Sequence, residues 1–488
     1  MKKTYLSSIL VIVMLLGSYL GVSADETLPK HTLKSNSQVL FHTLPESAQS
    51  LSEVLSKGIF YGRIRSNSFY LDYKKNDDSS DHFSSGLGGS LIYKSASFSH
   101  FDFTMGLYFS QAFFWDKEDE IENLKKAKDV LSRFDYTNDG RSYMAVLGQS
   151  YIRYTPIDGT HMMLGRQLVE TFYTKSNDTK MIPNTFDGLV ISTNIIPKTR
   201  TKLAYLQKQK LRDHTQSHSV LMYGDANSTS ALNPQWSQND DSAMHKGLTY
   251  TALKEAGKPT DAPLIVADFQ NTSLHNIQVN ASFYSVPELL SQAMLELNYA
   301  TKVQNVRVSY GVRYIKQFDN GAGAVGGASY TGDSTGYKDP ESLESQMIAA
   351  RVVSKIGKYK INLGYTNILD EADLITPWRG FPTSGYTRSM ARYNWRANTQ
   401  SYRLEVVKNA NDTALYKDMF IQASILYKNA DESKGAKDEI YYYVGFVQNA
   451  ANFQNLQWRL RLGYAHYLKA IDRDDSNLDS RFEIDYLF

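Results

Sequence analysis

Short segments in which apolar and polar residues alternate recur along most of this chain. In 306–314, Val and Tyr residues occupy one parity, and Arg, Ser and Gly occupy the other. Successive side chains of a β-strand point to opposite faces, so each such segment predicts a strand with one apolar and one polar face. The same alternation is clear in 101–109, 359–365 and 456–464. These segments are about as long as the 9–11 residues that cross a bilayer as a tilted strand.

The last segment, 481–488, alternates in the same way. Its charged parity holds Arg481, Glu483 and Asp485, and its apolar parity holds Phe482, Ile484, Tyr486 and Phe488. A strand of this kind also suits a soluble sandwich, with its apolar face packed inward. Its aromatic terminus, however, resembles the closing strand of bacterial outer-membrane barrels, which the assembly machinery recognises. The four apolar-parity residues are therefore the expected assembly signal.

The first 24 residues have the features of a secretory signal peptide. Lys2 and Lys3 precede a short apolar run, and Val22-Ser23-Ala24 forms a small-x-small cleavage site. The chain contains no Cys, which excludes a lipoprotein anchor and a disulfide framework. No later stretch approaches the roughly 20 apolar residues of a transmembrane helix. Since removal of Lys2 and Lys3 takes two charges from a net charge of +2, the mature chain is near neutral and its charge indicates no partner.

The connections between the predicted strands alternate between short and long. Short turns are expected at 94–97, 156–159, 195–198, 272–275, 300–304, 356–358, 409–415 and 450–455. The intervening connections are mostly longer, at 75–81, 113–142, 170–185, 209–262, 286–289, 318–344, 367–398, 429–438 and 468–478. A membrane barrel with tight periplasmic turns and extended surface loops requires this alternation, whereas a sandwich does not.

These patterns predict an all-β fold, a transmembrane antiparallel β-barrel of about 18 strands. Segment 388–396 also alternates, but the order of long and short connections assigns it to the long loop before Gln400, which keeps the number of strands even. The expected organisation is a signal peptide (1–24), a periplasmic N-terminal lead-in (25–57) and the barrel domain (58–488). The barrel is expected to lie in the outer membrane of a Gram-negative bacterium.

Three sets of segments stand out in order along the chain: 52–58 leading into 62–65, then Leu164-Gly165-Arg166-Gln167 followed by 181–188, and finally 376–383. Together they resemble the OprD-type substrate-specific porins. Their order and their places relative to the predicted strands carry the resemblance over nearly the whole mature chain. It implies an 18-stranded channel for small solutes, often carboxylates, that is narrowed by inward-folded loops and lined by a row of basic side chains.

Basic residues on the inner parity are the candidate pore-lining and solute-binding residues. Guanidinium groups match carboxylates and stay charged at any working pH, so a row of them along a lumen would attract anions. The alternative is that these positions only tolerate water, paired with inner carboxylates such as Asp102, Glu296, Glu405, Glu483 and Asp485. The candidates are Arg63, Arg65, Arg200, Lys202, Arg307, Arg313, Arg403, Arg459 and Arg461, with Arg166 added by resemblance.

Two loops are the candidate constriction. The restricted φ angles of Pro183, Pro377 and Pro382 would stiffen inward-folded segments. Phe186, Trp378 and Phe381 are the candidate apolar wall opposite the basic row, with Asn184 and Asp187 beside them. The alternative is a pair of surface loops whose aromatic residues merely pack on each other at the barrel mouth.

The expected function is passive diffusion of small hydrophilic solutes, anionic or carboxylate-bearing, through a basic lumen. The expected partners are these solutes, membrane lipid and lipopolysaccharide, and the barrel assembly machinery, with no nucleic acid; the expected oligomeric state is a monomer or homotrimer. An outer-membrane enzyme and a non-conducting surface adhesin are the alternatives. The sequence has neither a G-x-S-x-G nor an H-E-x-x-H motif, so no catalytic residue, metal or cofactor is expected.

Overall fold

The computed structural model describes residues 28–74, 81–115, 129–224, 243–468 and 476–488. The predicted signal peptide lies outside these ranges, so its removal stays a prediction. The described elements are β1 (His31–Leu33), β2 (Val39–Phe41), α2 (Leu51–Ser56), β3 (Ile59–Tyr73), β4 (His82–Lys94), β5 (Phe101–Trp115), α4 (Arg133–Asp139), β6 (Tyr143–Ile157), β7 (Thr160–Gln167), β8 (Thr185–Thr193), β9 (Thr199–Lys210), α5 (Tyr250–Glu255), β10 (Leu264–Asn271), β11 (Ile277–Val286), β12 (Leu290–Val303), β13 (Val306–Asp319), α6 (Gly323–Gly326), β14 (Ser345–Ile356), β15 (Tyr359–Ile368), β16 (Thr399–Lys408), β17 (Phe420–Asn429), the 3-10 helix η3 (Glu432–Lys434), β18 (Glu439–Ala450), β19 (Phe453–Tyr467) and β20 (Asn477–Leu487).

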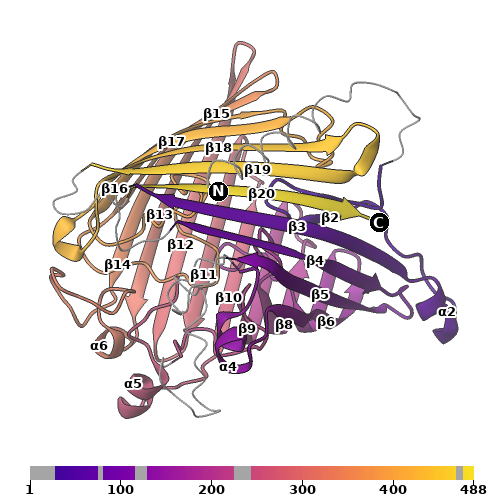
Figure 1. Cartoon of the computed structure of the whole chain (residues 1–488), viewed down its shortest axis with the longest axis horizontal. Helices are drawn as coiled ribbons and strands as arrows, with labels where there is room; N and C mark the ends of the chain where they lie inside the picture. Colours follow the sequence, from indigo (N-terminus) through magenta and orange to yellow (C-terminus); the bar gives the residue numbers. More distant parts are fainter. Residues whose placement is uncertain (1–27, 75–80, 116–128, 225–242, 469–475) are drawn as a thin grey trace.

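Within the described residues, β3 to β20 form one closed barrel of 18 strands, as the sequence predicts (Figure 1). Each strand pairs antiparallel with its neighbours in the chain, and β20 pairs with β3 to close the sheet, with Tyr486 opposite Ile64. Because the barrel is closed, every strand has a hydrogen-bonded neighbour on both sides. The backbone N–H and C=O groups therefore find partners within the sheet, which the lipid of a bilayer could not provide.

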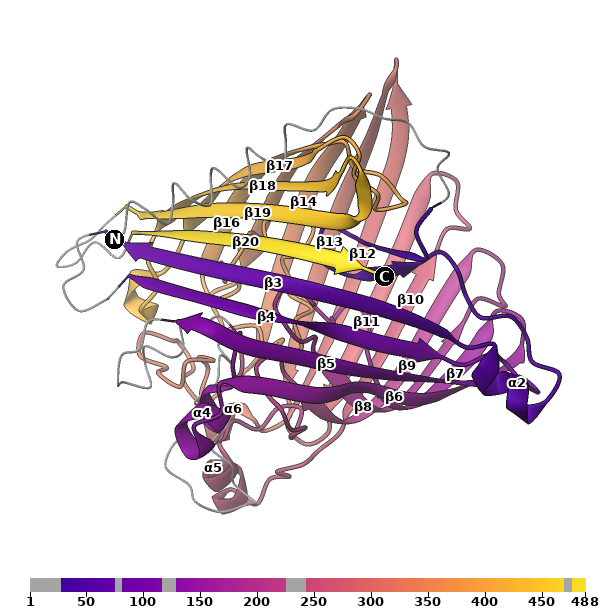
Figure 2. The ribbon, with the colours of Figure 1, turned by 45° about the vertical axis from the view of Figure 1, so that its right-hand side comes forward.

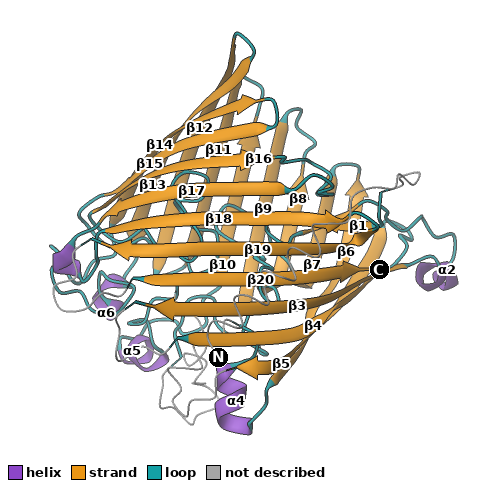
Figure 3. Cartoon of the chain, turned by 45° about the horizontal axis from the view of Figure 1, so that its top comes forward, coloured by secondary structure: helices purple, strands orange, loops and turns teal. Residues whose placement is uncertain are grey.

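The connections follow the predicted order of short and long. Every predicted short turn coincides with a connection at one end of the barrel, from 95–100 between β4 and β5 to 451–452 between β18 and β19. Segment 388–396 lies in the loop between β15 and β16, which confirms its assignment as loop. Helices α4, α5 and α6 gather at the long-loop end, while α2 lies at the short-turn end (Figures 2 and 3).

The predicted parity of the strands is also confirmed. On β13, Tyr310, Val312 and Tyr314 are 44–54% exposed on the outer surface, whereas Gly311 and Arg313 are buried inside. The pattern recurs on β5, where Met105 faces outward and Asp102 inward. Apolar residues outside and polar residues inside are the arrangement of a barrel that sits in lipid. Among the helices of the described segments, none is long and apolar enough to cross a membrane.

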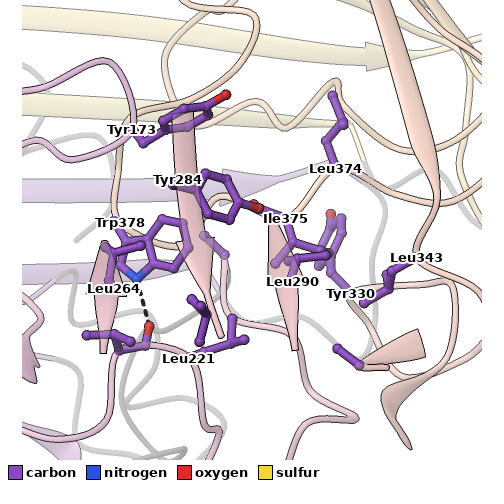
Figure 4. Close-up of a cluster of buried hydrophobic side chains, with 14 of the residues drawn as sticks. Tyr173, Leu221, Leu264, Tyr284, Leu290, Tyr330, Leu343, Leu374, Ile375 and Trp378 are labelled. Atoms are coloured by element: carbon purple, nitrogen blue, oxygen red, sulfur yellow. Dashed lines mark hydrogen bonds between the residues drawn. The ribbon is translucent and has the colours of Figure 1, made fainter. Parts of the chain in front are cut away.

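The largest apolar core lies inside the barrel, between the wall and the long loops. Tyr284 on β11 packs edge-to-face against Tyr173 and Trp378, with ring centroids 4.7 and 4.8 Å away. The indole Nε1 of Trp378 donates a hydrogen bond of 2.7 Å to the carbonyl of Val220 in the loop between β9 and β10 (Figure 4). Three loops are therefore packed against one wall strand, which holds them within the barrel.

The N-terminal segment differs from the expected lead-in. Residues 28–43 form a hairpin of β1 and β2 that packs against the inner side of the wall: His31, Thr32 and Leu33 are at most 3% exposed. Helix α2 follows at the short-turn end and leads into β3. The sequence could not predict this hairpin because its strands have three residues each, too few for a periodic signal.

The closing seam between β20 and β3 offers a test of the assembly signal. The aromatic ring of Phe488 lies where a Cβ of Gly62 would stand, 2.1 Å from its nearest ring carbon, and the two backbones exchange hydrogen bonds of 2.8 and 3.0 Å. Deleting Phe488 should lower the yield of heat-modifiable barrel in cells, because the seam loses this packing. Gly62→Val should lower it also, by displacing the ring, while Leu91→Val on the neighbouring outward surface should not. Normal yield from the Phe488 deletion would contradict the expected assembly role.

Candidate permeation pathway

Two long loops meet inside the barrel and join by backbone hydrogen bonds. The β7–β8 loop (168–184) and the β15–β16 loop (369–398) form an antiparallel bridge between Thr174 and Arg379. Lys175 N–H donates to the carbonyl of Trp378 at 2.9 Å, and Gly380 N–H donates to that of Tyr173 at 3.0 Å. We call this contact the loop ladder. A Cβ on Gly380 would lie 2.2 Å from the Phe172 carbonyl oxygen, so only glycine permits this approach.

Beyond the ladder, the β7–β8 loop is fixed to β3 of the wall by one buried carboxylate. Asp178 accepts hydrogen bonds from Arg63 at 3.0 Å and from Arg65 at 2.8 Å, both on β3. Arg65 and Asp178 are buried, so solvent screens their attraction little. The loop therefore crosses from β7 to the seam of the barrel and is held there by a bifurcated ion pair.

The network around Asp178 continues along the wall. Arg65 also pairs with Glu483 on β20, and Arg63 pairs with Asp485 at 3.1 Å. Glu483 in turn accepts from Arg459 on β19 at 3.2 Å. Alternating signs along neighbouring strands stabilise buried charges that would be costly alone. We call these residues, Arg63, Arg65, Asp178, Arg459, Glu483 and Asp485, the anchor network.

A cavity of about 450 Å³ lies between the two loops and the wall formed by β16 to β20. Of the described residues that line it, none is Asp or Glu. We call it the basic cavity, because its lining includes seven basic side chains, Lys180, Arg212, Arg379, Arg388, Arg403, Arg461 and Arg481. The aromatic residues Phe381, Tyr393 and Tyr443 line the same cavity.

The charge of some of these cations is balanced by carboxylates that do not line the cavity. Arg212 pairs with Asp129 at 3.0 Å, Arg403 with Glu405 at 3.0 Å, and Arg481 with Asp479 at 2.6 Å. The carboxylates are not part of the cavity lining, so the surface toward the cavity stays positive. This arrangement offers guanidinium groups to an anion while their charge is partly balanced within the wall.

Arg388 has no carboxylate within ion-pair distance among the described residues, in contrast to Arg212, Arg403 and Arg481. Its guanidinium group stacks over the Phe381 ring at 4.6 Å and donates to the Arg392 carbonyl at 2.7 Å. Burial lowers the pKa of Arg388 to about 10, so this loop residue stays charged at neutral pH. Its charge is therefore not balanced by an ion pair within the described residues.

A second cavity of about 590 Å³ lies against the other wall, from β7 to β13. Its lining carries both signs, with Arg200 and Lys202 near Asp268 and Glu296. Several of these groups are already paired: Lys202 donates to the Glu170 carbonyl at 2.7 Å, and Asp268 accepts from the Phe172 N–H at 2.6 Å. The two cavities share no lining residue among those described, since the two joined loops separate them.

The residues of the predicted basic row lie in different places: in the two cavities, in the anchor network and at the rim of the barrel. Arg403 and Arg461 line the basic cavity, and Arg200, Lys202 and Arg313 line the second cavity. Arg63, Arg65 and Arg459 are at most 4% exposed and belong to the anchor network, so they do not offer a free cationic surface. Arg166 pairs with Asp187 at 2.7 Å, and Arg307 is exposed at the short-turn rim. The inner carboxylates all pair with arginine: Glu296, Glu405, Glu483 and Asp485 with residues of the predicted row, and Asp102 with Arg153.

The predicted constriction residues are also divided. Phe381 lines the basic cavity, whereas Trp378 is fully buried in the core and forms no wall of it. Phe186 and Asp187 lie within β8 and not in the loop, because the strand begins at Thr185. Pro183, Asn184, Pro377 and Pro382 serve the packing of the loops: the Pro183 carbonyl accepts from Lys210 at 3.1 Å, Asn184 N–H donates to Ser176, and the Pro382 carbonyl accepts from Arg313 at 2.6 Å.

Sequence reasoning missed five of the seven cations of the basic cavity. Lys180, Arg212, Arg379 and Arg388 lie in loops, where no periodicity assigns a side chain to the lumen. Arg481 carried a usable signal, because it shares the inner parity of Glu483 and Asp485 on the last strand.

A closed 18-stranded barrel with an apolar outer surface and loops folded into its lumen has the architecture of an integral outer-membrane porin. Solved porins share it. OccK9 (OpdG) of Pseudomonas aeruginosa matches with a TM-score of 0.65 at 14% identity, over 89% of this chain and 99% of its own. OpdK of the same organism, solved with vanillate, matches at 0.64 and 12% identity over 89% and 99%, and OccAB1 of Acinetobacter baumannii at 0.64 and 13% over 91% and 99%.

No protein-family model and no curated protein matches the chain. The resemblance to OprD-type porins is thus confirmed by the fold, at a sequence identity of 14% or less for these three structures.

Proposed function

We propose that the protein is an outer-membrane channel for passive diffusion of small hydrophilic solutes, selective for anions that carry a carboxylate. One observation carries the proposal: seven basic side chains and no acidic one line the basic cavity within the described residues. Guanidinium groups bind carboxylates through paired hydrogen bonds, so this lining would concentrate such anions. The aromatic residues beside Arg388 would accept a planar apolar part of the same solute.

A structural neighbour supports this class of solute. OpdK was solved with vanillate, which is an aromatic carboxylate. A ligand of that kind has an anionic end for the arginines and a ring for Phe381 and Tyr393. Like such channels, the protein would span the membrane as a monomer or homotrimer in contact with lipid and lipopolysaccharide, after assembly by the barrel machinery and removal of residues 1–24.

The test is a measurement on the purified protein in a planar lipid bilayer. We expect discrete single-channel currents and, under a salt gradient, a reversal potential of the sign given by an anion-selective pore. Adding vanillate or benzoate should reduce the chloride current through competition for the basic cavity. Absence of currents from folded barrel would favour the adhesin or enzyme alternatives, and a cation-selective reversal potential would contradict the role of the basic cavity.

A further inference from the structure

The N-terminal hairpin, residues 28–43, lies inside the barrel toward the short-turn end, beside the β16–β17 turn. Three hydrogen bonds hold it against the barrel, from the β16–β17 turn, from β19 and from β3. Thr32 Oγ1 donates to the carbonyl of Thr413, in the turn between β16 and β17, at 2.6 Å. Gln457 on β19 donates to the Leu33 carbonyl at 3.3 Å, and Tyr61 on β3 donates to the Thr43 carbonyl at 2.6 Å.

Apolar packing adds to these hydrogen bonds. Leu40 packs against a buried wall cluster that includes Val407, Tyr416 and Phe420. Phe41 lies edge-on to Tyr61, with ring centroids 4.7 Å apart. An isolated two-stranded hairpin is at best marginally stable in water, so the wall contacts hold this one in its conformation.

The tip of the hairpin reaches the basic cavity. Ser35 and Asn36 line it together with Asn177 of the β7–β8 loop and Arg461 of the wall. The cavity is therefore bounded from the short-turn side by the hairpin and from the long-loop side by the two joined loops. Ser35 and Asn36 therefore form part of the boundary of the basic cavity on its short-turn side.

The hairpin is also hydrogen-bonded to the anchor network. Arg459 donates to Ser37 Oγ and to the Lys34 carbonyl, and the same guanidinium pairs with Glu483. Glu483 pairs with Arg65, which holds Asp178 of the β7–β8 loop. Hydrogen bonds to Arg459, followed by ion pairs through Glu483 and Arg65 to Asp178, thus connect the hairpin to the β7–β8 loop.

We propose that residues 28–43 form a plug, which narrows the basic cavity from the short-turn end and limits conductance while it is docked on β3 and β16–β19. Undocking of the plug widens the exit without changing the barrel, because none of the 18 wall strands includes its residues. This proposal rests on the proposed channel function in one respect only, which is that the lumen must conduct ions.

Two variants test the plug in the full-length protein. In the first, residues 31–42 are replaced by a Gly-Ser linker of equal length, which removes the wall contacts and preserves the chain connection. In the second, Thr32→Cys and Thr413→Cys place a disulfide between plug and wall, in a chain that has no other Cys. Leu51→Ser with Leu55→Ser is the matched control, because both side chains are more than 60% exposed on α2, in the same N-terminal segment.

We expect the linker variant to conduct at least about twofold more than wild type, since a two-stranded ribbon about 10 Å wide leaves the exit. The disulfide variant should show fewer transitions to high conductance, and a reductant should restore them. The control should match wild type. Heat-modifiable mobility on gels verifies that each barrel is folded.

The outcomes separate this proposal from the proposed function. Wild-type conductance in a folded linker variant would overturn the plug while leaving the channel intact. A disulfide variant that forms its bond and yet gates like wild type would overturn it also. Absence of current in every variant, including the linker variant, would instead contradict the channel function.

Discussion

Arg388→Gln combined with Arg461→Gln should shift the reversal potential under a salt gradient strongly toward cations. Both residues line the basic cavity, and Arg388 has no carboxylate within ion-pair distance among the described residues. Two unit charges about 4 Å apart interact by about 4 kcal/mol at an effective dielectric near 20. Even about a third of that energy, roughly 1.4 kcal/mol, corresponds to about tenfold in anion occupancy. We therefore expect the anion-to-cation permeability ratio to fall about tenfold or more, measured in planar bilayers.

A matched control removes two positive charges elsewhere. Lys302 and Arg307 face each other across the β12–β13 turn, are exposed, and line neither cavity. Lys302→Gln with Arg307→Gln should leave the permeability ratio close to wild type. The difference between the two double variants should shrink at 1 M salt, where the Debye length is about 3 Å. Equal permeability ratios at low salt would show that the cavity charges do not determine selectivity.

Asp178→Ala should release the β7–β8 loop from the wall and raise conductance. The substitution leaves Arg63 and Arg65 without the carboxylate that neutralises them from the loop side, and breaking a buried ion pair costs about 3–5 kcal/mol. Glu483 and Asp485 still pair with both arginines on the wall. The substitution should therefore loosen the loop and leave the barrel folded. Limited proteolysis should cut 168–184 faster, and single-channel recordings should show larger and noisier currents.

Asp102→Ala is the control for loss of an inner ion pair. Asp102 pairs with Arg153 at 2.7 Å along the wall between β5 and β6 and touches neither loop. It should lower thermal stability slightly and leave conductance unchanged. If Asp178→Ala conducts and resists protease as wild type does, the loop is held by the loop ladder alone and the anchor network is not needed for the constriction.

The barrel could be predicted from the sequence because its signals are local. Each strand carries its own alternation, as Tyr310, Gly311 and Val312 do on β13, and lipid outside with water inside forces that alternation on every strand. The alternating connection lengths then fix the direction of each hairpin. Neither signal depends on knowing which residues meet in space.

The candidate site depended on contacts between distant segments and could be predicted only in part. Inner parity identified Arg63 and Arg65 as lumen-facing, but it could not reveal that Asp178, more than 100 positions away, pairs with them. The same limit hid Arg388, whose place is set by loop packing. Trp378 was assigned to a pore wall because aromatic loop residues suit that role, whereas Tyr284 and the Val220 carbonyl draw it into the core.

The loop ladder has a mechanical consequence. A ring of 18 strands is wide, and lateral pressure in a membrane tends to flatten such a ring into an oval. The β7–β8 loop reaches the seam at Asp178, and the β15–β16 loop, which begins on the wall between β15 and β16, joins it through Lys175 and Gly380. The two loops start from nearly opposite parts of the ring, at β7–β8 and at β15–β16, so their backbone hydrogen bonds link these two parts across the lumen and should hold their separation. The bore should then keep its cross-section when the surrounding bilayer changes in tension or thickness.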